Sequence, residues 1–226
     1  DGNLMGKKVQ ENDKELRKIL DRISDPEKKL DMYREKKQEF SEKIDKLFKG
    51  AYSDMQDAVK KQIENGNLKD LSLEEVVNEE KQINFPVRRI ITAGDDICFV
   101  SEGRIGIECA VSFIKALTKK ENEEDKEGYA ACAGIAIVHQ KYPFYRAYEL
   151  AESLCSNAKK FGVKWSDDET GSEISAIDWH VEFGEMGDTL SEIRQQYCAA
   201  DGNRLEMRPY IVKVNQIKDA SGKEKE

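Results

Sequence analysis

Two adjacent carboxylates, Asp95 and Asp96, stand between two short apolar runs in the stretch Phe85 to Val100. The runs are rich in β-branched and aromatic residues, which favour strands. The turn Ala93-Gly94-Asp95-Asp96 between them predicts a β-hairpin with both acids at its tip. Adjacent acids repel each other, whereas hard cations such as magnesium take carboxylate oxygens as ligands. A divalent-metal site is one interpretation, and the other is that Asp is simply a common turn residue.

A second candidate for ligand binding is the opening segment, Asp1-Gly2-Asn3-Leu4-Met5-Gly6. An acid, an Asn and two glycines ahead of a helical pattern indicate the end of a strand turning into a helix N-terminus. Free backbone N–H groups at such a terminus can hold phosphate. The alternative is a terminus without fixed structure.

The composition limits the classes of function. Charged residues make up 36% of the 226 residues, hydrophobic residues 38%, and the net charge is −8. The negative charge argues against a protein that coats nucleic acid nonspecifically. The five cysteines form no CxxC or Cys/His cluster, so we expect reduced thiols in a cytoplasmic protein and no zinc site. No signal peptide or membrane-spanning run is present in the sequence.

The first part of the chain is predicted to be helical from residue 10 to 65, with a break at Asp25-Pro26, where Asp25 is the N-cap. The apolar residues after the break form a long amphipathic stripe. Packing back as a helical hairpin is favoured over a coiled-coil dimer. Ser72-Leu73-Glu74-Glu75 has the pattern of a capping box and predicts a short helix to about Gln82.

The second part of the chain alternates between strands and helices, which predicts an α/β sandwich. The expected segments are a helix over Gly103–Leu117, a charged loop over 119–128, a buried strand over Tyr129–His139, a helix over 143–161, an acidic loop over 165–173, a strand over Ile174–Phe183, a short helix capped by Asp188, an extended edge segment over 204–212 with Pro209, and a frayed tail over 213–226.

Four stretches in this order resemble the palm domain of the large, polymerase-like subunit of type III CRISPR effector complexes. Residues 1–6 (DGNLMG) are similar to that family's DGDNMG, and residues 93–96 (AGDD) to its GGDD. Residues 133–143 (AGIAIVHQKYP) resemble its AGIAIAHxKxP segment. Residues 175–180 (SAIDWH) and 208–210 (RPY) resemble its closing segments. Diguanylate cyclases of the GGDEF type share the core more distantly.

The resemblance implies a ferredoxin-like palm of class α/β, with a mixed sheet and a GDD hairpin. The palm would comprise residues 1–9 and 85–212, with 10–84 as a long helical insertion. The implied function is a nucleotidyltransferase or cyclase that makes cyclic or linear oligonucleotides from nucleoside triphosphate, ATP first among them, in antiviral defence. The implied cofactors are two Mg²⁺ or Mn²⁺ ions. Implied partners are other CRISPR-type subunits, with guide RNA through them. A homodimer is left open, and no membrane is expected.

The resemblance also assigns roles to individual residues. Asp1, Asp95 and Asp96 would be the catalytic acids and metal ligands. Nucleotide binding would fall to the segment Gly2, Asn3, Leu4, Met5 and Gly6, through the N–H groups of Asn3 to Gly6, together with Gly94 and Lys141. His139 and His180 are expected to be packing residues without an acid partner, rather than catalytic bases.

Two departures from the family pattern, together with the long charged helices of residues 10–84, fit a second interpretation. Ala93 replaces the first Gly of the hairpin, and Asn3 replaces the second acid of the opening motif. We also expect a strand to precede Asp1, so the chain is expected to be a fragment. The alternative function is a non-catalytic palm that acts as a nucleotide-sensing or protein-interaction module of a CRISPR-type complex.

Overall fold

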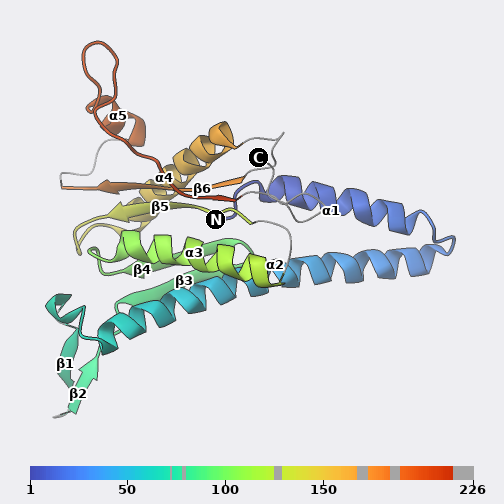
Figure 1. The fold of residues 1–226 in the computed structure, drawn as a ribbon, viewed down its shortest axis with the longest axis horizontal. Helices are drawn as coiled ribbons and strands as arrows, with labels where there is room; N and C mark the ends of the chain where they lie inside the picture. Colours follow the sequence, from blue (N-terminus) through green and yellow to red (C-terminus); the bar gives the residue numbers. More distant parts are fainter. Residues whose placement is uncertain (72, 78–79, 125–128, 167–172, 184–188, 216–226) are drawn as a thin grey trace.

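The computed structural model of the chain describes residues 1–71, 73–77, 80–124, 129–166, 173–183 and 189–215. It is a mixed α/β fold in which helices lie on both sides of a three-stranded mixed sheet (Figure 1). The predicted fold class is therefore confirmed. No helix in the described part of the chain has the length and apolarity needed to cross a bilayer.

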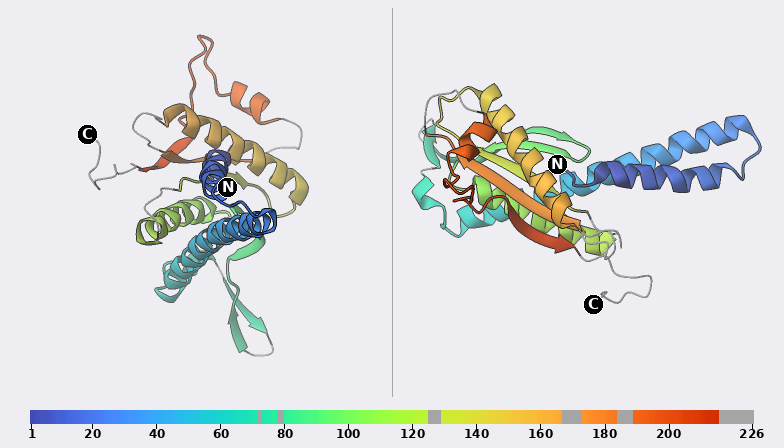
Figure 2. Two further views of the ribbon diagram at one scale, coloured as in Figure 1. Left: turned by 90° about the vertical axis from the view of Figure 1, so that its right-hand side faces the viewer. Right: turned by 90° about the horizontal axis from the view of Figure 1, so that it is seen from above.

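Helix α1 (Met5–Leu20) and the N-terminal half of α2 (Pro26–Glu64) form an antiparallel arm that projects beyond the rest of the molecule (Figure 2). Asp25 caps α2, as predicted, because its side chain accepts hydrogen bonds from the first backbone N–H groups of the helix. An ion pair of 2.7 Å between Lys37 Nζ and Asp13 Oδ1 joins the two helices. The favoured helical hairpin is thus the observed arrangement.

The C-terminal half of α2 belongs to the main core. Its buried side chains start at Ile44 and continue with Leu47, Phe48, Ala51, Tyr52, Met55 and Val59. They pack against helix α3 (Gly106–Glu124) and against residues of the sheet, such as Ile177. This part of α2 and the elements after residue 84 therefore share one hydrophobic core.

The predicted hairpin is present as β3 (Val87–Ala93) and β4 (Asp96–Ser101), which pair antiparallel. Ala93 pairs with Asp96, so Gly94 and Asp95 form a two-residue turn. Gly94 has a φ of 62°, which glycine adopts without steric cost at the first position of such a turn.

The sheet has the order β5-β6-β7, formed by β5 (Cys132–Ile137), β6 (Glu173–Val181) and β7 (Tyr210–Asn215). Strand β6 runs parallel to β5 and antiparallel to β7, which lies at the edge as Pro209 suggested. Successive residues of a strand point to opposite faces.

Opposite faces of β6 therefore pack against different helices. Ile174 and Ala176 join the cluster that contains Ala158 of helix α4 (Phe144–Trp165), whereas Ile177 joins the core of α2 and α3.

Helix α4 lies directly against β5 at Gly134. A Cβ atom added at Gly134 would stand 2.0 Å from the carbonyl oxygen of Ala151 and 2.3 Å from the backbone nitrogen of Cys155. Such distances exclude any side chain, so the glycine allows the backbones of helix and strand to approach. This contact fixes the position of α4 along β5.

The predicted helix from Ser72 to Gln82 is wrong. The chain forms a second antiparallel hairpin there, β1 (Glu74–Val77) and β2 (Glu80–Ile83), and Asn84 N–H donates to Leu73 O at its base. The capping-box pattern is short, and the β-branched residues in this stretch favour a strand. Pairing with a partner strand has overridden the local helical signal.

Other boundaries also differ from the predictions. Helix α3 continues to Glu124, through much of the expected charged loop, because Lys and Glu are good helix formers. The strand expected over Tyr129–His139 is limited to β5. The short helix α5 (Leu190–Gln195) is capped by Thr189 in a capping box, in place of Asp188, which lies outside the described residues. Strand β7 reaches into the predicted tail, and residues 216–226 lie outside the described part.

Candidate active site

Three carboxylates from distant parts of the sequence meet in one cluster. One ligand atom from each of Asp1, Asp95 and Asp96 lies within 4.8 Å of the other two. Asp1 and Asp95 are partly buried, and Asp96 is exposed. The structure therefore brings together the three residues to which the sequence assigned metal binding.

Asp1 reaches the hairpin because the opening segment is fixed to the beginning of β5. Gly2 forms an isolated antiparallel bridge with Ala131, and Cys132 N–H donates to Asp1 O at 2.9 Å. Gly2 lies close to the acids, since a Cβ added there would stand 2.9 Å from Asp95 Oδ2 and would require that side chain to shift. The backbone of the opening segment thus lies against the hairpin tip.

Asn3 faces away from the acids. It is 2% exposed, its backbone N–H donates to Ala130 O at 2.7 Å, and its side-chain Nδ2 donates to Ile174 O at 3.0 Å. Its N–H group is therefore already paired, so the expectation that this N–H holds a phosphate does not fit the structure. The replacement of an acid by Asn3 consequently removes no oxygen from the observed cluster.

The segment then turns sharply into α1. Leu4 has a φ of 55°, in the left-handed region, which costs an L-residue about 1–2 kcal/mol. No side chain caps the helix. Helix α1 therefore begins at Met5 and Gly6, only a few residues after Asp1. The positive end of the helix dipole and the first N–H groups of the helix lie at this N-terminus.

The three acids suit a hard divalent cation. Mg²⁺–oxygen bonds of about 2.1 Å put two ligands of one ion at most ~4.2 Å apart, and Ca²⁺ allows up to ~5 Å. Oxygens within 4.8 Å therefore need only small side-chain rotations to reach a common ion. Three carboxylates would also leave coordination positions of an octahedral ion for water or phosphate oxygens.

Lys159 is a member of the site that sequence reasoning missed. Its Nζ lies 2.5 Å from Asp1 Oδ2, and both side chains are one-third exposed. A signal for it existed: a helix that returns from the end of a strand brings its last turns back to the beginning of that strand, where Asp1 lies. A lysine beside the inward-facing Ala158 could have been placed there.

Lys141 is not brought to the acids. Asp1 lies beside Cys132, at the first residue of β5, whereas Lys141 follows the last residue, Ile137. At about 3.3 Å per residue, the five steps of the strand alone span roughly 17 Å. The N–H group of Lys141 donates to His139 Nδ1 at 3.2 Å.

Asp45 of α2 is a second residue that sequence reasoning missed. Its Oδ1 accepts from the backbone N–H of Gly94 at 3.2 Å, and its Oδ2 lies 2.8 Å from Lys49 Nζ. The hydrogen bond from Lys49 is the main cause that lowers the pKa of Asp45 below its ordinary value. An amphipathic pattern contains no sign of this contact, because it joins positions 49 residues apart.

His180 has the acid partner that the sequence did not show. Its Nε2 lies 3.6 Å from Glu182 Oε2, and the ring is 6% exposed. Burial lowers the pKa of His180, although the neighbouring Glu182 opposes this shift. His180 Nδ1 is buried without a hydrogen-bond partner among the described residues, so, contrary to expectation, the histidine is not fully satisfied.

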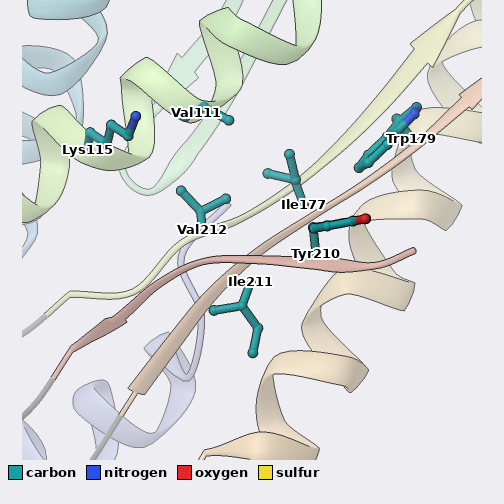
Figure 3. A pocket seen from close by; sticks show the side chains of 7 residues that line it. All are labelled: Val111, Lys115, Ile177, Trp179, Tyr210, Ile211 and Val212. Atoms are coloured by element: carbon teal, nitrogen blue, oxygen red, sulfur yellow. The ribbon is translucent and has the colours of Figure 1, made fainter. Parts of the chain in front are cut away.

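A separate cavity of about 300 Å³ lies between α3 and strands β6 and β7 (Figure 3). Its lining is mostly apolar and includes the rings of Trp179 and Tyr210, whose centroids are 5.5 Å apart, and the stem of Lys115. None of the three acids lines it, so it is distinct from the candidate active site.

Comparison with known families identifies the fold around this site. The model of the family "Cas10/Cmr2, second palm domain" matches residues 1–165. The match includes the opening segment, the helical arm, the acidic hairpin and Lys159. Comparison with curated proteins gives no match. Because the family match spans well over half of the chain, the protein belongs to the second palm domains of the Cas10/Cmr2 family.

Proposed function

We propose that the protein is a metal-dependent nucleotidyltransferase or cyclase that makes cyclic or linear oligonucleotides from a nucleoside triphosphate, with ATP as the first candidate. The observation that carries this proposal is the convergence of Asp1, Asp95 and Asp96 within 4.8 Å. Membership of the Cas10/Cmr2 family supports a role in antiviral CRISPR signalling, with other subunits and their guide RNA as partners.

Asp1, Asp95 and Asp96 would hold the two Mg²⁺ or Mn²⁺ ions. Bound there, the ions would supply charge stabilisation for the attack of a ribose hydroxyl on an α-phosphate and for the departure of pyrophosphate. The acids orient this arrangement by their fixed positions on the hairpin tip and the opening segment. The close approach of Gly2 to Asp95 supports a site whose acids are already near one another before substrate binds.

Phosphate binding would use the groups next to the acids. Lys159 is a cation whose ammonium group is already at the cluster, and a triphosphate offers it stronger partners than one carboxylate. The N–H groups of Leu4, Met5 and Gly6 would add donors at the start of α1. Gly94 keeps the hairpin tip free of a side chain. Lys141 would serve at most a part of the nucleotide distant from the acids.

The buried Asn3 also bears on the alternative of a non-catalytic palm. Asn3 was one of the features that fitted that alternative, together with Ala93 and the long charged helices of residues 10–84. Its side chain is used in packing, through its hydrogen bond to Ile174 O, and not at the acid cluster. The position of Asn3 therefore does not count against a catalytic role for Asp1, Asp95 and Asp96.

The test is incubation with each nucleoside triphosphate and Mn²⁺ or Mg²⁺, with pyrophosphate release and mass spectrometry of the products as readouts. We expect turnover by the chain and its loss in the double variant Asp95→Ala/Asp96→Ala. The matched control is Asp31→Ala/Asp57→Ala, which removes two exposed acids of α2. Equal activity of the hairpin variant and the control would refute the proposal. Binding of nucleotide without turnover would support the sensing or interaction module instead.

A further inference from the structure

The acidic turn is tied to a helix that contributes no acid to the cluster. The backbone N–H of Gly94, the group just before Asp95, donates to Asp45 Oδ1 at 3.2 Å. Asp45 comes from α2, 49 residues earlier in the chain. It is not among the three clustered carboxylates, so its contact with the site is through the backbone of the turn.

Asp45 is itself held firmly. The preceding residue Ile44 and the nearby Phe48 are buried at 5% and 0% exposure, which fixes this part of α2 in the core. The second oxygen of Asp45 accepts from Lys49 Nζ at 2.8 Å, one helical turn away. The carboxylate therefore presents an acceptor to Gly94 from a rigid element on a fixed side of the hairpin.

The N–H that Asp45 binds belongs to the Ala93–Gly94 peptide, which leads directly into the turn before Asp95 and Asp96. Gly94 has a positive φ and Asp95 does not, which matches a two-residue turn with glycine at its first position. A glycine turn has several peptide orientations of similar energy, and repulsion between the acids favours those that separate Asp95 and Asp96 from Asp1. A hydrogen bond to Gly94 N–H restrains the Ala93–Gly94 peptide and so opposes that separation.

We propose that Asp45 is a positioning residue of the site, which holds the Gly94–Asp95 turn in the conformation that brings the hairpin acids to Asp1. The metal-binding part of this inference rests on the proposed function. Without the acceptor, the competent turn is only a fraction of the population, and the apparent metal affinity falls by that fraction. Helix α2 thereby supports the site although it contributes no carboxylate to the acid cluster.

The experiment compares Asp45→Ala with Asp45→Asn, which retains an acceptor oxygen but loses the charge. Asp31→Ala is the matched control on the exposed part of the same helix. Hydrogen exchange of residues 92–97 without metal reports the turn, and calorimetric titration with Mn²⁺ reports the site. Alanine is the best helix former, so Asp45→Ala is expected to fold.

We expect Asp45→Ala to speed exchange at the turn and to weaken Mn²⁺ binding about three- to tenfold, the range for loss of one ordinary hydrogen bond at a partly exposed side chain. Asp45→Asn should stay within about twofold of the unmodified chain, because its oxygen can still accept. Equal behaviour of Asp45→Ala and Asp31→Ala would overturn the proposal. So would an equal loss in both Asp45 variants, since it would assign the effect to charge.

The two proposals fail in different ways. If the unmodified chain binds no Mn²⁺, the proposed function fails, while hydrogen exchange still decides the role of Asp45 at the turn. If Asp95→Ala/Asp96→Ala abolishes Mn²⁺ binding and Asp45→Ala changes neither exchange nor affinity, the proposed function stands and the positioning role falls.

Discussion

Replacing Lys159 with Met should strengthen metal binding and weaken nucleotide binding. Lys159 Nζ lies 2.5 Å from Asp1 Oδ2, so the ammonium group competes with a cation for this carboxylate. Methionine keeps an unbranched stem and a similar helix propensity and removes the charge. The two effects have opposite signs because the positive charge of Lys159 repels a metal ion but attracts a triphosphate.

The size of the metal effect follows from the geometry. A cation on Asp1 would lie roughly 5 Å from Lys159 Nζ, the 2.5 Å ion pair plus a metal–oxygen bond of about 2.1 Å. At this distance the repulsion between charges of +1 and +2 is about 1.7 kcal/mol in a water-like dielectric. Screening at physiological salt, with a Debye length of about 8 Å, reduces it to roughly 1 kcal/mol. Lys159→Met should therefore bind Mn²⁺ about fivefold more tightly.

The assay is calorimetric titration with Mn²⁺ alone, followed by ATP at saturating Mn²⁺. Lys160→Met is the matched control, since Lys160 is the next residue on α4 and its side chain is exposed. We expect the ATP affinity of Lys159→Met to fall at least fivefold, as befits loss of a charge-assisted contact. Weaker Mn²⁺ binding in Lys159→Met, or equal effects of the two variants, would refute the role of Lys159 as a displaceable cation.

Two further predictions concern stability. Gly134→Ala should lower the free energy of unfolding by about 3 kcal/mol, because its Cβ would stand 2.0 Å from Ala151 O. Urea titration measures this change. The control is Gly103→Ala, whose Cβ would meet only a contact of 3.4 Å. Burial lowers the pKa of His180 below 6.5, so the unfolded chain binds more protons and stability should fall as the pH drops through about 6.5. Between pH 8 and pH 5, thermal unfolding should show a smaller loss of stability for His180→Gln than for His139→Gln. Equal losses of stability in the two variants would contradict the assignment of this pH dependence to His180.

The acidic hairpin could be predicted because its signals are local. β-branched runs on either side of Gly94-Asp95 determine both the strands and the turn. The convergence of Asp1 with these acids was inferred from the order of motifs in a family. No local pattern contains it, since it depends on a backbone bridge between Gly2 and Ala131, far apart in the chain.

The contacts that complete the site depend on packing. Lys159 reaches Asp1 because α4 returns along β5, and Asp45 reaches Gly94 because the buried half of α2 lies beneath the hairpin region. Both contacts join segments whose own patterns show only amphipathic helices. The error at β1 and β2 has a related origin, because a four-residue capping signal was weighed without the strand pairing that competes with it.

The close contact at Gly134 has a kinetic consequence for the site. Helix α4 cannot slide along β5 without driving its own backbone into the strand, so Lys159 cannot leave Asp1 by movement of the helix. Departure must occur by rotation about the bonds of the lysine side chain, which is one-third exposed. Such rotations take picoseconds to nanoseconds, whereas helix shifts take microseconds to milliseconds. Exchange of the lysine for an incoming cation is therefore expected to be far faster than any backbone rearrangement of the palm.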